Sequence, residues 1–283
     1  MTSFVRTIMI GACVAAVCLA AAATAAAQTS RPQPVYVEVP EPDFSLVNLP
    51  TTRPLPKSKS SFHLTHRFLG NLRQNSFSTN LGNVFGLDNG AMVGLEYRMA
   101  LSGSLQAVFY RTSVDKTIQF SAKLDAVRQT GSAPVSVSAI VSIEGNQNFG
   151  LQDTPGAVKY KSPAVGAVIS RTFGEHAAFY AVPMFVHNSL KLADGSSRDT
   201  FMLGGGARVQ VRPTVYLVGD VSPRLAGYAP GPPVFGFGIE KRAGWHMFQL
   251  NISNSTSTTF GQLARGGFPT TIYLGFNLGR KFL

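Results

Sequence analysis

The stretch TIQFSAKLDA at residues 117–126 decides the fold, because its polar and apolar residues alternate without interruption. Every second residue from Ile118 to Ala126 is apolar, and the residues between them are polar or charged. A period of two is the repeat of a β-strand, whose successive side chains point to opposite faces of a sheet. The stretch therefore predicts a strand with one apolar face and one polar face.

The same alternation recurs down to the C-terminus and predicts about twelve strands. Connections after even-numbered strands are short, whereas those after the first, fifth, seventh, ninth and eleventh reach about a dozen residues or more at ordinary strand lengths. Short turns on one side and long loops on the other are typical of transmembrane β-barrels. The predicted class is all-β, an up-and-down antiparallel transmembrane β-barrel over residues 61–283. Its predicted strands are 61–68, 90–99, 104–111, 117–128, 134–143, 163–172, 177–187, 201–211, 215–221, 234–240, 245–252 and 270–282.

Composition supports this interpretation. Charged residues make up 14% of the chain, against roughly 25% in ordinary soluble domains. A soluble protein covers its exterior with polar groups, whereas the lipid-facing band of a barrel must be apolar. A secreted soluble β-sandwich is the main competing fold, because its strands alternate too. Its outer faces would be rich in charge, which the polar faces here are not.

The N-terminus predicts export. Arg6 precedes an apolar stretch, and small residues at 25–27 suit cleavage before Gln28, so residues 1–27 are predicted to be a secretory signal peptide. Both cysteines, Cys13 and Cys18, lie within it, which leaves the mature chain without disulfides or thiolate metal sites. Loss of Arg6 lowers the net charge from +11 to +10. Export and the scatter of the basic residues argue against a nucleic-acid partner.

Residues 28–60 are rich in proline and end in the polar run from Lys57 to Ser60. Proline cannot donate to a β-ladder, so this segment is predicted to be a periplasmic linker, extended and disordered. At the other end, Phe282 lies one place before the last residue of an alternating strand. This ending resembles the C-terminal signal read by the barrel-assembly machinery. The expected location is the outer membrane of a Gram-negative bacterium, in contact with membrane lipids and lipopolysaccharide.

Several short phrases resemble an uncharacterised bacterial outer-membrane β-barrel family, domain of unknown function 5777. The resemblance implies an exported barrel and no established substrate. The phrases are His66-Arg67-Phe68, Gly86-Leu87-Asp88, Gly94-Leu95-Glu96-Tyr97, Pro223-Arg224-Leu225-Ala226-Gly227-Tyr228 and His246-Met247-Phe248-Gln249-Leu250.

Charged residues within the predicted strands are expected to face the lumen, because a Lys or Arg in mid-bilayer costs about 2 to 4 kcal/mol. Twelve strands enclose a backbone diameter of about 24 Å, which such side chains would crowd. We therefore expect a narrow channel or small-solute translocator whose selectivity depends on the lumen's charges. The alternative is a non-conducting barrel that uses its long loops for binding, adhesion or assembly. The predicted lumen residues are Glu96, Arg98, Lys123, Asp125, Arg208, Asp220 and Glu240.

One arrangement raises an enzymatic alternative. His187 and Ser197 resemble the hydrolytic pair of outer-membrane phospholipase A, in which a histidine activates a serine. The asparagine that orients the histidine in that family is missing, and Phe201 stands four residues after Ser197 instead. We therefore predict that the protein is not an enzyme, with a lipid hydrolase as the alternative.

No metal or cofactor is predicted. His63 and His66 are three residues apart, which places them on opposite faces of a strand. The triplet Gly204-Gly205-Gly206 lacks the following lysine and helix of a phosphate loop. It predicts a bend or a close approach of two backbone segments instead.

Overall fold

The computed structural model describes residues 41–146, 161–191, 197–227 and 231–282. The predicted signal peptide, residues 28–40 and the loop 147–160 lie outside these ranges. The strands are β1 (Ser60–Phe68), β2 (Ala91–Ala100), β3 (Leu105–Thr112), β4 (Thr117–Val127), β5 (Ser136–Asn146), β6 (Lys161–Phe173), β7 (Ala177–Lys191), β8 (Ser197–Arg212), β9 (Val215–Ser222), β10 (Arg224–Ala226), β11 (Val234–Ala243), β12 (His246–Ser253) and β13 (Tyr273–Phe282). The helical turns are α2 (Phe77–Gly82), η1 (Val84–Asn89), η2 (Val114–Lys116) and α3 (Phe260–Leu263).

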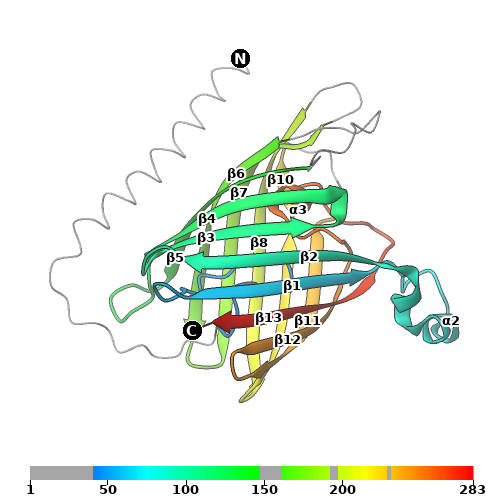
Figure 1. Ribbon diagram of the computed structural model, residues 1–283, viewed down its shortest axis with the longest axis horizontal. Helices are drawn as coiled ribbons and strands as arrows, with labels where there is room; N and C mark the ends of the chain where they lie inside the picture. The colour runs from blue at the N-terminus through cyan, green and yellow to red at the C-terminus, as the bar shows by residue number, and fades with distance from the viewer. Residues whose placement is uncertain (1–40, 147–160, 192–196, 228–230, 283) are drawn as a thin grey trace.

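The sheet closes on itself through an antiparallel pairing of β1 with β13, in which Ser60 lies opposite Phe282. All other pairings in the ring are antiparallel between strands that follow each other along the chain, except that β9 pairs with β11. The three-residue strand β10 is an extra piece attached to β8. The prediction of a twelve-stranded antiparallel barrel is therefore confirmed (Figure 1).

The two faces of the barrel differ in the way the alternation predicts. On β4, Phe120 is exposed on the outside, while Gln119 and Lys123 are buried. The outer surface carries large apolar side chains on every strand of the ring, such as Leu95 on β2 and Leu250 on β12. An apolar exterior around a closed ring of paired backbone groups is what hydrocarbon requires of a membrane-spanning sheet.

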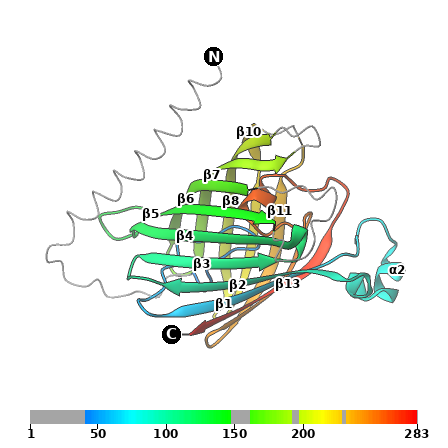
Figure 2. The same cartoon turned by 45° about the horizontal axis from the view of Figure 1, so that its top comes forward.

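The prediction of a disordered linker is wrong for residues 41–56. These residues, which we call the interior hairpin, fold back at Ser45 and Pro50, which form a β-bridge, and lie inside the barrel. Figure 2 shows the segment in blue, surrounded by strands. The sequence contains the cause: Phe44, Leu46 and Leu49 interrupt the prolines, and each is at most 4% exposed. Burial of these side chains offsets the conformational entropy that would otherwise keep the segment disordered.

The two mouths of the barrel differ. The turns at one mouth are short, and two of them contain glycines with positive φ, Gly174 at 56° and Gly244 at 59°, a conformation that glycine adopts without strain. The other mouth has the long loops. The connection of β1 to β2 carries α2 and projects beyond the barrel (Figure 1), whereas the connection of β12 to β13 carries α3, whose Leu263 is buried.

One predicted long loop is shorter than expected. β7 runs on to Lys191 and β8 begins at Ser197, so the two strands extend beyond the predicted ends at 187 and 201. Residues predicted to be in the loop pair across the two strands instead, as Leu190 does with Arg198 and Lys191 with Ser197, and so prolong the hairpin. No helix in the described ranges has the length and apolar character needed to cross a membrane.

A charge placed on the outer face tests its contact with lipid. Leu250 at the middle of β12 is 59% exposed, and Leu81 on the projecting α2 is 56% exposed, so the two sites are matched in residue type and exposure. We expect Leu250→Arg to lower the free energy of unfolding in lipid vesicles by about 2 to 4 kcal/mol. Leu81→Arg should change it by less than about 0.5 kcal/mol. Equal effects in urea titrations would contradict a lipid-facing β12.

Candidate functional site: the barrel lumen

The structure places all seven predicted lumen residues on the inner face of the barrel. Arg208 on β8 and Glu240 on β11 are fully buried, whereas the side chain of Glu96 on β2 is 15% exposed. Three pairs of opposite charge form along the wall. Their separations are 2.9 Å for Arg98–Glu96, 3.1 Å for Lys123–Asp125 and 2.7 Å for Arg208–Glu240.

The interior hairpin is held mainly through its backbone carbonyl groups, to which wall side chains donate. Arg208 donates to Ser45 O at 2.6 Å. Lys123 donates to Thr51 O at 3.1 Å and to Arg53 O at 2.7 Å. The other wall donors come from β1, β3, β12 and β13, so opposite walls grip the same segment. They are Arg67 and Asn277 to Val47 O, Gln249 to Leu46 O, Gln106 to Arg53 O and Lys281 to Pro42 O.

Asp220 on β9 binds the tip of the hairpin as a hydrogen-bond acceptor, whereas the wall residues named above act as donors. Its carboxylate accepts from the backbone N–H of Asn48 at 2.6 Å and of Leu49 at 3.1 Å, and from the Asn48 side-chain amide at 3.0 Å. Hydrogen bonds to a charged acceptor are among the stronger ones in proteins. Asp220 is 6% exposed. One carboxylate therefore binds the backbone N–H groups of both Asn48 and Leu49 at the tip.

Glycines on the inner face make room for the hairpin. A Cβ atom at Gly206 would lie 2.4 Å from Leu46 Cδ1, and one at Gly204 would lie 2.7 Å from Leu49 Cδ1. At Gly236 the nearest neighbours of such an atom, at 2.5 to 2.8 Å, all belong to Val47 and Asn48. The glycine triplet thus reflects a close approach, as the sequence suggested, but to the interior hairpin.

A second segment fills the lumen from the long-loop mouth. Thr259 caps α3, and its hydroxyl donates to Glu144 Oε1 at 3.0 Å, while Gly261 N donates to Glu144 Oε2 at 2.9 Å. Gln119 gives the same carboxylate a third bond at 2.8 Å. Leu263 of α3 joins one apolar cluster with the hairpin residues Leu46 and Leu49. The two inward-folded segments thus meet inside the barrel.

Sequence reasoning missed several lumen residues. Arg67 and Lys281 lie near strand ends, where alternation alone does not separate an inward side chain from one at the interface. Asp43 belongs to the supposed linker, yet it is 5% exposed and lies 3.8 Å from His63 Nε2. The available signal was the apolar phrase from Phe44 to Leu49, which a solvated linker does not need.

The candidate hydrolytic pair is not brought together by the strand register. His187 Nδ1 lies 2.7 Å from Asp199 Oδ1, whereas Ser197 pairs with Lys191, four residues further along β7. Four residues of strand span about 13 Å. The side chain of Ser197 is outside what the structure describes, and the expectation that the protein is not an enzyme stays a prediction.

The two histidines of β1 lie on opposite faces, as their spacing predicts. His63 is buried beside Asp43 in the lumen, and His66 stacks on Phe276 with ring centroids 4.6 Å apart. In the described ranges, no group of three or more His, Cys, Asp and Glu side chains is arranged to hold a metal ion.

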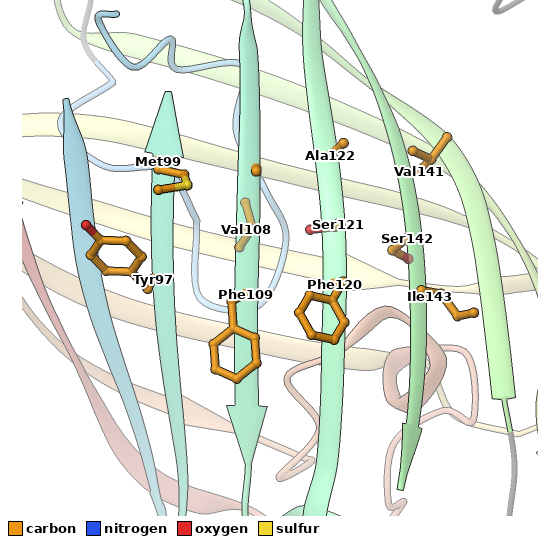
Figure 3. A pocket seen from close by; sticks show the side chains of 11 residues that line it. Tyr97, Met99, Val108, Phe109, Phe120, Ser121, Ala122, Val141, Ser142 and Ile143 are labelled. Carbon is orange, nitrogen blue, oxygen red and sulfur yellow. The ribbon is translucent and has the colours of Figure 1, made fainter. Parts of the chain in front are cut away.

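A hollow of about 600 Å³ lies on the opposite side of the wall from the lumen (Figure 3). Cross-strand pairs create it: Phe109 lies opposite Phe120 in one row, and Ala107 lies opposite Ala122 in the next. The small alanines leave a gap beside the large rings. Because Phe120 is 56% exposed on the outer face, this hollow belongs to the lipid-facing surface and is not a site reached from the lumen.

Comparison with known proteins agrees with this architecture. The family described as "Membrane bound beta barrel domain (DUF5777)" matches residues 43–282, so the matched region includes most of the interior hairpin. The chain is similar to the COG4313 outer membrane channel from Pseudomonas putida F1, with 13% identity, a TM-score of 0.53 and coverage of 81% of this chain and 97% of that one. It is also similar to the NanC porin, with 7% identity, a TM-score of 0.51 and coverage of 80% and 100%. At such identities the likeness shows the fold alone. No curated protein matches the chain.

Two carboxylates hold two different segments, which gives a paired test. Asp220→Ala removes the acceptor of Asn48 N and Leu49 N, and bonds to charged groups are worth about 1.5 to 3 kcal/mol each. We expect amide hydrogen exchange in peptides covering 44–52 to quicken about tenfold or more, with 257–264 unchanged. Glu144→Ala should produce the reverse pattern. Equal changes in both regions for both variants would contradict this division of roles.

Proposed function

The chain belongs to the family of membrane-bound β-barrel domains, and from this premise we propose that it is a narrow outer-membrane channel for small solutes, closed at rest by its interior hairpin. Short turns face the periplasm and long loops face outward in such barrels, so the hairpin enters from the periplasmic mouth. The proposal includes lipid and lipopolysaccharide around the apolar exterior and assembly through β13.

The observation that carries the proposal is the chemistry of the contact between wall and hairpin. Wall side chains such as Arg208 and Lys123 donate to hairpin carbonyl groups, and water can accept the same hydrogen bonds once the hairpin withdraws. The hairpin can therefore leave the lumen without breaking the backbone hydrogen bonds between the strands of the wall. The two antiparallel segments of the hairpin, with their side chains, have a width of roughly 10 Å, which is the spacing of packed sheets. Withdrawal would leave a path of about that width, lined by charged side chains such as Lys123 and Arg208 and, along β6 and β7, by apolar ones such as Val168 and Met184.

The closed state should dominate. Phe44, Leu46, Val47, Leu49 and Leu55 are each at most 4% exposed, and burial of one such side chain contributes about 1.5 to 3 kcal/mol. The summed burial free energy of the five side chains exceeds the roughly 5.5 kcal/mol that would change the ratio of closed to open protein from 1:99 to 99:1. Opening therefore needs a compensating interaction, and a wide, permanently open pore is not expected.

The two similar structures are those of an outer membrane channel and a porin, which supports the same class of function. One observation favours the alternative of a binding platform. The loop that carries α2 projects from the long-loop mouth and exposes Phe77 at 74% and Leu81 at 56%. A barrel that served as a platform alone would stay electrically silent under every condition that loosens the hairpin.

A reversible cross-link tests closure by the hairpin. The hydroxyl oxygens of Thr52 and Ser170 on β6 are 2.6 Å apart, so cysteines at both positions would place two sulfur atoms near the disulfide length of about 2.05 Å. We expect the Thr52→Cys/Ser170→Cys protein to show openings in planar bilayers when mild urea weakens apolar burial. Oxidation should abolish them and reductant restore them. The single-cysteine variants are the controls, and openings that persist after oxidation would count against closure by the hairpin.

Displacement of the hairpin should have the opposite effect. Gly236→Leu places a side chain where Val47 and Asn48 now lie, whereas the Cβ of Gly205→Leu would meet no atom closer than 4.0 Å. We expect Gly236→Leu to raise the open fraction many-fold in planar bilayers, either alone or combined with Glu144→Ala, which releases the α3 loop. Gly205→Leu should behave as the unaltered protein. A Gly236→Leu/Glu144→Ala barrel that folds and stays silent would contradict the channel.

A further inference from the structure

The unpaired cations of the lumen indicate what passes through it. We propose that the path opened by the hairpin selects small oxygen-rich anions, carboxylates among them, and that the interior hairpin occupies their binding groups in the closed state. The inference rests on the proposed channel and names its substrate class.

The charge pattern of the wall is the first step. Five buried cationic side chains face the lumen: Arg67, Arg98, Lys123, Arg208 and Lys281. Three of them pair with wall carboxylates within 3.1 Å. In the described ranges, Arg67 and Lys281 form no ion pair. Two lumen carboxylates remain: Glu144 lies near the end of β5 at the long-loop mouth, where it is bonded to the α3 loop, and Asp220 holds the tip of the hairpin. The five buried cations and the five lumen carboxylates of the wall balance in number, but Lys281 forms no ion pair with a wall carboxylate in the part of the chain that the structure describes. Without the hairpin, the excess of positive charge is therefore local and lies around Lys281, at the mouth where β13 ends.

The hairpin presents acceptors to these cations. Three consecutive carbonyl groups at its tip, those of Ser45, Leu46 and Val47, accept from Arg208, Gln249 and Arg67 respectively. Oxygen acceptors in sequence, gripped by guanidinium and amide groups, resemble the contacts that a solute with several oxygen atoms would make. Asp220 is the one wall residue in the described contacts that accepts from hairpin N–H groups.

The hairpin also carries a carboxylate, Asp43, into the part of the lumen where His63, Lys281 and Arg208 contact the hairpin. Asp43 lies 3.8 Å from His63 Nε2, and the carbonyl groups on either side of it along the chain, those of Pro42 and Ser45, accept from Lys281 and Arg208. Around it, buried donors remain without partners: His63 Nε2 and Arg208 Nη1 make no hydrogen bond, and neither does Arg67 Nε nearer the tip. Arg67 and Arg208 are 0% exposed. Buried donors usually have hydrogen-bond partners. Donors without partners beside a bound carboxylate are therefore expected at an anion site where the hairpin supplies fewer acceptor atoms than the site can bind.

These contacts suggest competition between solute and hairpin. A carboxylate that enters the periplasmic mouth would meet the groups that Asp43 now engages, and its interactions would replace those lost when the hairpin withdraws. Anion binding and opening are then coupled, because the same donors serve the hairpin and the solute.

Reversal potentials test the selectivity in the full-length Gly236→Leu protein, with Glu144→Ala added if the single variant stays silent. In a potassium chloride gradient we expect chloride to permeate several-fold better than potassium. Lys281→Gln and Arg67→Gln in that background should each move the permeability ratio toward one. Arg171→Gln removes an equal charge from an exposed position on β6 and should leave the ratio unchanged. Succinate added to the unaltered protein should raise its open fraction, whereas tetraethylammonium should not.

Each other outcome has a definite meaning. Cation selectivity, a ratio of one, or equal effects of Lys281→Gln and Arg171→Gln would overturn the anion assignment and leave the channel itself standing. An open fraction that does not respond to succinate would overturn the competition. Silence of the displaced-hairpin variants would remove the channel, and the inference with it.

Discussion

Hydrocarbon cannot hydrogen-bond a peptide group, and this constraint shapes the whole molecule. A sheet that spans a membrane has to pair every backbone N–H and C=O with its own strands, so it closes, as β1 and β13 do here. Closure of twelve strands creates an interior too wide for ordinary side chains alone to fill at about 24 Å between backbones. What fills that interior then decides whether the barrel conducts.

Two segments fill the lumen, the interior hairpin and the α3 loop, and the inner face of the wall has space for them. Inner glycines at 204, 206 and 236 leave gaps for Leu49, Leu46 and Val47. The polar groups of hairpin and wall satisfy each other, since buried carbonyl groups need donors and buried guanidinium groups need acceptors. The dry, closed arrangement and a wet, open one can both satisfy these groups. The apolar part of the wall, which includes Val182 and Met184, favours the closed arrangement, because it packs on Leu46 and Leu49.

The strands could be predicted from the sequence because lipid outside and polar filling inside impose a period of two, which the stretch from Thr117 to Asp125 shows without interruption. The lumen positions of Arg98, Lys123 and Arg208 could be predicted from their charge alone, because a charged side chain is costly in the lipid. The interior hairpin could not be predicted from proline content, because proline limits β-pairing but not burial, and the hairpin is held by the wall and not by a ladder of its own. Its register against Gly236 and Asp220 depends on residues nearly two hundred positions away, which no local pattern contains. The extension of β7 and β8 was missed because polar residues pair across strands as well as forming loops.

The most direct test of this account asks where the hairpin lies, independently of conductance. Residues 28–283 contain no cysteine. In a chain that begins at Gln28, single cysteines at Val47, which is 2% exposed, and at Lys57, which is exposed, can be compared by their rates of reaction with a bulky water-soluble maleimide. In the folded protein in lipid vesicles permeable to the reagent, the account predicts that the Lys57→Cys protein reacts fast. The Val47→Cys protein should react only after unfolding. Equal rates in the folded state would contradict a hairpin inside the barrel, and the closed channel with it.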